Sequence, residues 1–274
     1  MHARRTHSWM NSLSAVVLLL LLAAGAAATD VWDSASPNDD TPGNTRNVLQ
    51  PGDSQRHDVE AKAGPTADQD WFRLTVVAGH SYEVRVGGRQ EDCFDFSGSN
   101  FRILQSDGTT QITTGVDTPG TGIISSFRAT FVAPSNENVF VQLTGATTCN
   151  ATSEYTIEFF DTTLISPAWS TFGTFDTFYS IHNAGSTTLN GTLRLFDTTG
   201  AQLAFVDVSI APGLTFSTNT QPAQMNVTRN RNGVARFTHD GSATSVLAEA
   251  AIANFATPPG VIQPVKFQIV PKGN

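Results

Sequence analysis

Carboxylates that could bind a cation lie in two short segments of the sequence. The first is Asn38-Asp39-Asp40, and the second holds Asp68 and Asp70, directly before an apolar run. Calcium takes roughly six to eight oxygen ligands, so separate segments must converge to supply them. These five residues predict a calcium site, although their spacing is not that of an EF-hand loop. In the alternative, Asp39 and Asp40 solvate a linker, and Asp68 and Asp70 accept hydrogen bonds from backbone amides at a turn.

Histidines are the other side chains that could do chemistry. After residue 28 they are His57, His80, His182 and His239, and the sequence has neither a His-Glu-x-x-His motif nor a Gly-x-Ser-x-Gly elbow. His80 lies in a predicted turn, where a solvated structural role is the simpler interpretation. We therefore predict no catalytic residue. The alternative is a secreted hydrolase whose triad is assembled from distant loops.

The two cysteines, Cys93 and Cys149, flank predicted strands. An even number of cysteines in an exported protein favours a disulfide, which would tie two loops together and stabilise the fold by roughly 4 kcal/mol. Two free thiols are the first alternative, and metal ligation by two isolated cysteines is the second.

The first 28 residues predict export. Arg4 and Arg5 precede the apolar run 16–22, and Ala26-Ala27-Ala28 offers a cleavage site. The alternative, a membrane anchor, is disfavoured because the apolar stretch is shorter than the roughly 20 residues of a spanning helix. We expect a secreted, extracellular or periplasmic chain with no transmembrane segment after cleavage. Removing Arg4 and Arg5 leaves 14 basic against 24 acidic residues, a formal charge of −10 that argues against nucleic acid as a partner.

The elements that must position these groups are β-strands. Residues 71–77 and 81–86 each alternate apolar and polar side chains, on either side of a turn at Gly79. This pattern predicts a β-hairpin with one face in the core and the other in solvent. The inward side chains would be Phe72, Leu74, Val76, Tyr82, Val84 and Val86.

Alternation and turn signals continue along the chain in two blocks, with no convincing helix after residue 28. In the first block, strands are expected near 56–61, 71–77, 81–86, 100–105, 123–132, 138–143 and 154–160. In the second, they are expected at 175–183, 190–197, 202–210, 214–217, 225–229, 233–239, 245–254 and 265–270. Residues 246–255 are rich in alanine, but the following Pro258-Pro259 favours a buried strand over a helix.

The two blocks predict an all-β protein of two β-sandwich domains, the second immunoglobulin-like. The expected boundaries are a signal peptide at 1–28, an extended acidic lead-in at 29–47, a first sandwich at 48–161, a linker at 162–168 and a second sandwich at 169–274.

Several motifs in the first block resemble the bacterial pre-peptidase C-terminal (PPC) domain. They are Asp39-Asp40, 49–53 (LQPGD), 68–72 (DQDWF), 78–82 (AGHSY) and 155–157 (YTI), and the resemblance covers about residues 37–161. It implies a jelly-roll-like sandwich of the kind appended to secreted enzymes, which acts in secretion, localisation or substrate binding without catalysis. In similar collagen-binding modules, an acidic linker beside a strand-edge aspartate pair binds calcium. No peptidase precedes the domain in this sequence.

The second block is loosely similar to β-sandwich repeats of uncharacterised bacterial exported proteins, through 178–183 (FYSIHN), 191–197 (GTLRLFD) and 211–213 (APG). We therefore expect an exported, non-catalytic binding or surface-association protein that recognises an extracellular polymer or protein, with calcium as a candidate stabiliser. The alternatives are the hydrolase and a purely structural spacer.

Aromatic side chains suggest one place for such recognition. Trp71 and Trp169 fall outside the alternating apolar sets, and Phe172, Phe175 and Phe178 recur every third residue. They could form a surface for glycan or peptide. The simpler interpretation is that Trp169 and the phenylalanines pack between the two sandwiches, because large aromatic side chains are mostly buried.

Overall fold

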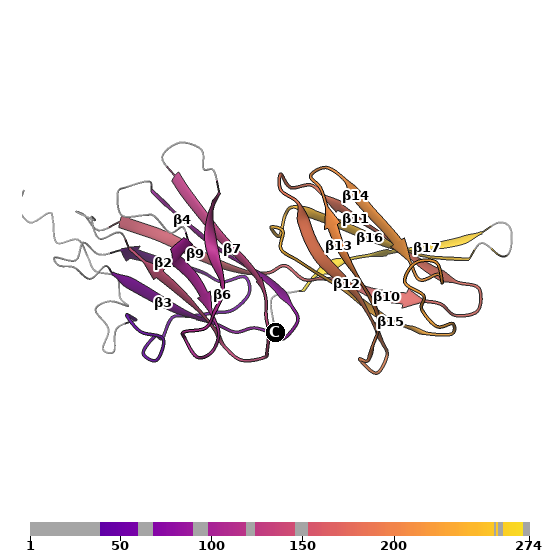
Figure 1. Cartoon of the computed structure of the whole chain (residues 1–274), viewed down its shortest axis with the longest axis horizontal. Coiled ribbons are helices and arrows are strands. Elements are labelled where there is room, and N and C mark those ends of the chain that lie inside the picture. Colours follow the sequence, from indigo (N-terminus) through magenta and orange to yellow (C-terminus); the bar gives the residue numbers. More distant parts are fainter. Residues whose placement is uncertain are drawn as a thin grey trace, which may run out of the picture.

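The computed structural model describes residues 39–59, 68–89, 98–118, 124–145, 153–254, 256 and 260–270. The predicted signal peptide (1–28), Asn38, Cys93 and Cys149 lie outside these ranges, so the leader and disulfide predictions stay predictions. Within the ranges the chain forms strands and no helix, and therefore has no helix that could span a membrane. The predicted all-β class with two β-sandwiches is confirmed (Figure 1).

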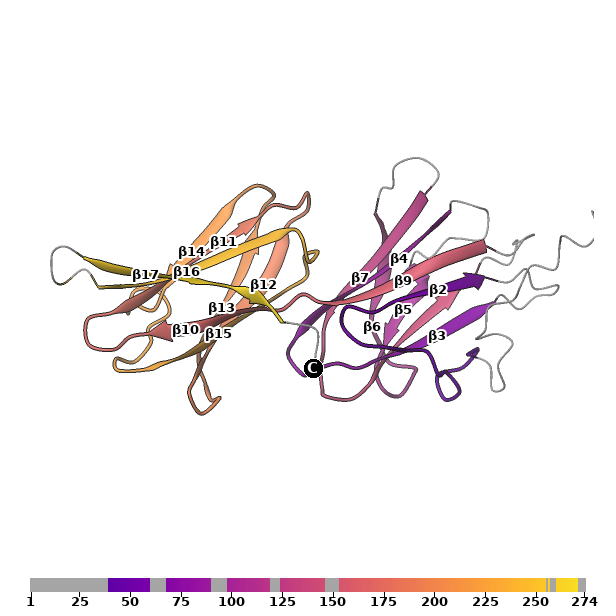
Figure 2. The ribbon, with the colours of Figure 1, turned by 180° about the vertical axis from the view of Figure 1, so that it is seen from behind.

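In the described residues the first sandwich has nine strands. They are β1 (Val48–Leu49), β2 (Ser54–Val59), β3 (Gln69–Leu74), β4 (Ser81–Arg89), β5 (Gly98–Leu104), β6 (Gln111–Thr118), β7 (Ile124–Val132), β8 (Val139–Thr144) and β9 (Ser153–Asp161). Hydrogen bonds connect them in the order β1-β3-β8-β5-β6-β7-β4-β9-β2. Because β6 pairs with both β5 and β7, the sheet turns over at β6 and its halves face each other (Figure 2).

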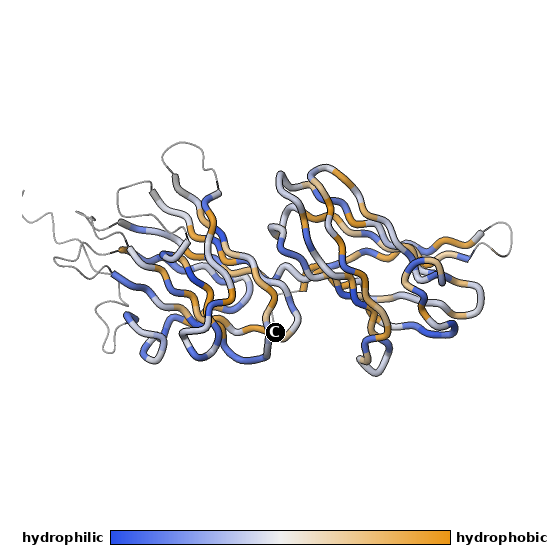
Figure 3. The backbone as a smooth tube through the Cα atoms, viewed as in Figure 1, coloured by the Kyte–Doolittle hydropathy of each residue, from blue (hydrophilic) through white to orange (hydrophobic). Residues whose placement is uncertain are grey.

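The apolar faces of both halves meet in one core. Phe72 and Leu74 of β3 are buried there with Tyr82, Val84 and Val86 of β4, as the alternation predicts. Figure 3 shows hydrophobic positions distributed along the strands of both sandwiches, while hydrophilic residues mark many of the connections. Burial of these faces is the main force that holds the two halves together.

The predicted hairpin between residues 71–77 and 81–86 is wrong. β3 pairs with β1 and β8, whereas β4 pairs with β7 and β9. The turn at Gly79 therefore carries the chain from one half of the sandwich to the other, with Gly79 at a φ of 70° that glycine adopts without strain. Alternation identifies a strand and its inward face, but it does not identify the strand with which it pairs.

Three strands were not predicted, the two-residue β1 among them, and one predicted strand is absent. β6 has the mainly polar sequence QITTGVDT, which offers little apolar alternation. β10 (Leu164–Ser170) contains Pro167 and occupies most of the predicted linker 162–168. The predicted strand at 225–229 is a turn region, where Asn226 has a φ of 50° that is incompatible with extended backbone.

The second sandwich consists of two sheets within the described ranges. Its strands are β10 (Leu164–Ser170), β11 (Asp176–Asn183), β12 (Leu189–Asp197), β13 (Gln202–Ile210), β14 (Thr215–Asn219), β15 (Asn232–His239), β16 (Val246–Asn254), β17 (Val261–Lys266) and β18 (Gln268–Ile269). One sheet has the order β13-β12-β15-β10-β18, and the other has the order β14-β11-β16-β17. Leu193 and Phe237 of the first sheet pack with Tyr179 and Ile181 of the second in a separate core. Residues 246–254 form a strand, as predicted.

The connection between the sandwiches is only two residues, Thr162 and Thr163, and both are buried. Ser81 at the start of β4 holds them. Its backbone N–H donates to Thr163 Oγ1 at 2.9 Å, its carbonyl accepts from the Thr162 N–H at 2.9 Å, and its hydroxyl accepts from Thr162 Oγ1 at 3.0 Å. We call this set the Ser81 clamp. It fixes the point at which the chain leaves the first sandwich.

Candidate functional site

Residues 39–47, the described part of the acidic lead-in, lie beside β3. The Asp39 carbonyl accepts the Trp71 N–H at 3.2 Å, and the Asn47 carbonyl accepts the Arg73 N–H at 2.7 Å. The Asn47 side chain donates to the Asp39 carboxylate and to the Trp71 carbonyl. β1 then continues along β3 in parallel register. The lead-in from Asp39 onward is therefore an edge of the sandwich.

Asp70 points into the interior of the same sandwich. It is buried, and its Oδ2 accepts a hydrogen bond of 2.5 Å from the hydroxyl of Tyr155 on β9. His57 of β2 is buried beside them, with its ring edge-on to Phe72 at 4.6 Å and stacked on Tyr155 at 5.8 Å. Asp70 therefore joins the two halves of the sandwich, whereas the turn-cap interpretation placed it before the strand.

The other predicted ligands occupy separate positions. Asp68 is buried just before β3 and accepts the Gln69 N–H at 3.1 Å, as a turn cap would, while Asp40 is half-buried. Among the residues that the structure describes, no three His, Cys, Asp or Glu side chains are grouped so that they could hold a metal ion. The calcium site therefore stays a prediction of the sequence.

The histidines do not combine the partners of a catalytic triad in the described ranges. The His80 Nδ1 lies 2.8 Å from Asp161 Oδ2, and the His182 Nδ1 lies 3.0 Å from Thr215 Oγ1, but neither ring bonds both a carboxylate and a hydroxyl. His57 is 1% exposed, so a substrate cannot reach its ring. His239 is also buried, and burial lowers its pKa.

The aromatic residues do not form one surface. Trp169 is 1% exposed and belongs to the second core, where its indole N–H donates to the carbonyls of Phe196 and Val234 at 2.9 and 3.2 Å. Trp71 is 5% exposed and meets Phe140 edge-on. Phe172 is 64% exposed in a turn. Trp169 therefore packs within its own sandwich, not between the two.

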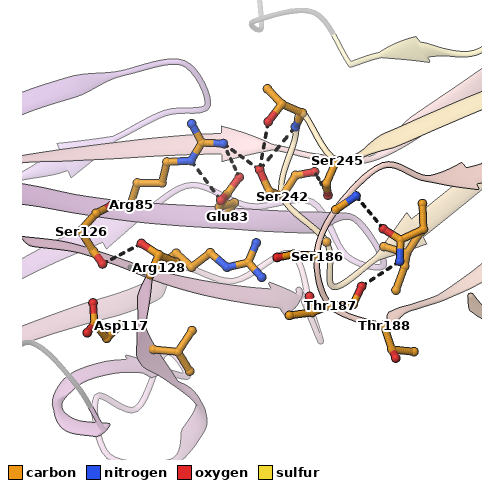
Figure 4. A pocket seen from close by; sticks show the side chains of 17 residues that line it. Glu83, Arg85, Asp117, Ser126, Arg128, Ser186, Thr187, Thr188, Ser242 and Ser245 are labelled. Carbon is orange, nitrogen blue, oxygen red and sulfur yellow. Dashed lines mark hydrogen bonds and ion pairs between the residues drawn. The ribbon is translucent and has the colours of Figure 1, made fainter. Parts of the chain in front are cut away.

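A cleft lined by residues of both sandwiches lies at their junction, and no sequence pattern predicted it. Its volume is about 520 Å³. The first sandwich contributes the outward faces of β4, β6 and β7, and the second contributes the turns at 185–188 and 241–245. The polar residues that Figure 4 labels are Glu83, Arg85, Asp117, Ser126, Arg128, Ser186, Thr187, Thr188, Ser242 and Ser245.

Bonds across the domain junction hold one wall of the cleft. Arg85 donates through Nε and Nη2 to the two carboxylate oxygens of Glu83, both at 3.0 Å, and also donates to Ser242 Oγ at 3.0 Å. The buried Glu83 carboxylate in turn accepts the Ala243 N–H at 3.0 Å. The Arg85 guanidinium also lies over the ring of Phe160, 4.8 Å from its centroid. These bonds connect residues of β4 with a turn about 160 positions later, so the cleft has a defined geometry.

Arg128 is arranged differently. It stands directly opposite Arg85 in the β4–β7 ladder and is half-buried. Figure 4 shows its guanidinium extending across the cleft toward Ser186. No side chain in the described residues forms an ion pair or hydrogen bond with this guanidinium, and the exposed Asp117 of β6 lies on the same side of the cleft. The cleft thus presents one available cation, one available carboxylate and several hydroxyls.

Comparison with known proteins gives structural likenesses only. No family model matches the chain, and no curated protein does. One similar solved structure is the pre-peptidase C-terminal domain of a collagenase from Bacillus anthracis, with 13% sequence identity and a TM-score of 0.28; the match covers 41% of this chain and 92% of that one. Another is a glycosyl hydrolase family 2 member from Bacteroides cellulosilyticus, with 10% identity and a TM-score of 0.23; the match covers 77% of this chain and 29% of that one. Neither likeness carries a functional argument.

Proposed function

We propose that this chain is an exported, non-catalytic binding protein that holds part of an extracellular polymer in the cleft between its two β-sandwiches. The observation that carries the proposal is the cleft itself, about 520 Å³ in volume and lined by side chains of both sandwiches. This size lies within the range of ligand-binding clefts, and clefts at domain boundaries are frequent binding sites. Export rests on the sequence of residues 1–28.

The fixed junction supports binding at this position. The contacts of Arg85 and Glu83 with residues 242 and 243 hold the two walls together before any ligand arrives. A site that is already assembled loses less conformational entropy on binding. Calcium is not part of this proposal, because the described acidic residues do not group as ligands.

Two other functions would require different features. A hydrolase needs an accessible general base with its partner groups, and the described histidines are either buried or lack a carboxylate. A structural spacer needs no ligand cleft. The proposal therefore differs from both in one measurable property, which is ligand binding that depends on the cleft.

The test is binding of residues 29–274 to a panel of immobilised polysaccharides and matrix proteins, compared with Ser186→Trp, which places a large side chain in the cleft. The control is Thr174→Trp, another exposed turn residue of the second sandwich that lies outside the cleft. We expect wild type and the control to bind one class of polymer and Ser186→Trp to lose at least tenfold in affinity. Equal binding by all three proteins would refute the proposal, as would no binding by any.

A further inference from the structure

We infer that the interdomain cleft recognises a uronic-acid-containing polysaccharide, and that Arg128 binds the carboxylate of one uronate residue. The inference rests on the proposed function, since it names the class of polymer for the same cleft.

The first argument is the pair of arginines on adjacent strands. Arg85 and Arg128 are direct cross-strand neighbours, an arrangement in which like charges destabilise a sheet. Arg85 is compensated by the Glu83 carboxylate and by the Phe160 ring. Arg128 has no such compensation within the described chain, and an anion bound beside it would supply one. Two guanidiniums at this position are therefore best accounted for by an anionic ligand.

The second argument is the chemistry of the available guanidinium. Its planar fork of N–H donors matches the two oxygens of a carboxylate, and it remains charged at any physiological pH. Arg128 is half-buried, so the aliphatic part of the side chain is held by the cleft while the charged end faces the cavity. A bidentate carboxylate is the simplest group that satisfies it.

The third argument is the remainder of the lining, which suits a sugar ring. Ser186, Thr187 and Thr188 are exposed on one wall, and the Asp117 carboxylate can accept hydrogen bonds from ligand hydroxyls. A uronate carries its carboxylate and several hydroxyls on one ring. Val116 and Leu189 also line the cleft and can contact the apolar face of a sugar ring.

The cleft is less suited to other polymers. No aromatic side chain lines it in the described residues, so a neutral sugar would lack the stacking platform on which its apolar face usually rests.

The chain as a whole is acidic, with a formal net charge of −8, and long-range electrostatics therefore repel polyanions. Binding of a uronate polymer must then depend on the local charge of Arg128.

The experiment is calorimetric titration of residues 29–274 with three probes, namely tri-galacturonate, its methyl ester and poly-glutamate. The variants are Arg128→Gln and Arg128→Lys. The control is Arg73→Gln, which removes a half-buried arginine from the other half of the same sandwich. We expect wild type and Arg73→Gln to bind tri-galacturonate, with Arg128→Gln weaker by roughly tenfold or more and Arg128→Lys intermediate. The methyl ester and poly-glutamate should bind at least tenfold more weakly.

The outcomes separate the inference from the function on which it rests. If Arg128→Gln binds tri-galacturonate as wild type does, or if the methyl ester binds equally well, the anion inference is overturned. If Ser186→Trp still abolishes binding in that case, the proposed function stands. If poly-glutamate binds as tightly as tri-galacturonate, the cleft selects carboxylates without recognising sugar, and the polysaccharide assignment is wrong. If no probe binds while the panel above identifies another polymer at the cleft, only the inference fails.

Discussion

The hydroxyl of Tyr155 donates a hydrogen bond to the carboxylate of Asp70 across the interior of the first sandwich, between residues 85 positions apart in the chain. Both side chains are buried, and their strands β9 and β3 belong to opposite halves of the sandwich. A buried bond to a charged acceptor contributes more than an exposed one, because water does not compete for it.

Removal of this hydroxyl should weaken the fold. We expect Tyr155→Phe to lower the free energy of unfolding by about 1–3 kcal/mol in urea titration. The control is Tyr179→Phe in the second sandwich. The Tyr179 hydroxyl is buried without a hydrogen-bond partner in the described part of the chain, so its removal should be neutral or stabilising. Equal losses in both variants would mean that the Asp70 bond contributes nothing specific.

The calcium prediction can be separated from a purely structural role by thermal unfolding in calcium and in chelator. A ligand that binds only the folded state raises its melting temperature, and Asp68→Ala or Asp70→Ala would abolish that rise. From the bonds of Asp70 and Asp68 in the structure, we expect Asp70→Ala to lower the melting temperature equally in both buffers. A rise with calcium in wild type alone would establish the metal site that the sequence predicts.

Acid should destabilise the second sandwich through His239. Burial lowers the pKa of this imidazole from 6.5, against weaker opposing effects of the Thr162 and Gly241 backbone and of Asp240 and Glu83. The unfolded chain therefore binds a proton more readily than the folded one, and stability falls as the pH drops through 6.5 toward the lowered value. Urea titrations between pH 7.5 and 5.5, a range chosen around that pKa of roughly 6.5, should show this slope in wild type.

His239→Gln should flatten this slope, whereas His182→Gln, which leaves His239 in place, should retain it. If the slope is the same in all three proteins, another group causes the pH dependence.

Gly233 is required by a close approach of two strands. A Cβ at this position would lie 1.9 Å from the Phe196 carbonyl oxygen, a backbone atom that cannot rotate away. We expect Gly233→Ala to cost about 1–3 kcal/mol of unfolding free energy, because β12 and β15 must separate. Gly43 has open space around it, and Gly43→Ala should change stability by less than about 1 kcal/mol. Similar values for the two variants would contradict the steric argument.

Local pattern was sufficient to predict most of the strands and their inward faces. Alternation placed Phe72 and Val84 in the core, and the turn signals located most strand ends to within a few residues. Local pattern failed where strand pairing is decided by contacts between residues far apart in the sequence. Besides β1, β3 pairs with β8, about 70 residues later, and the polar β6 is a strand because its neighbours complete the sheet. The hairpin prediction failed for the same reason.

The cleft could not be predicted because each of its residues is unremarkable in sequence. Arg85 and Arg128 occupy outward strand positions, and Ser186 and Ser242 occupy turns. They meet only because the second sandwich docks in one orientation, which no local pattern specifies. The alternation of residues 81–86 did indicate that Arg85 faces outward, but not that another domain covers it.

The Ser81 clamp gives the junction a mechanical property. When the two sandwiches are pulled apart, no loose linker can lengthen between them, because Thr162 and Thr163 are already hydrogen-bonded to β4. The sandwiches lie end to end along the long axis of the molecule (Figure 1). Stretching along that axis would load the clamp hydrogen bonds and the Arg85–Ser242 contact together, so the cleft would open only when the junction itself ruptures.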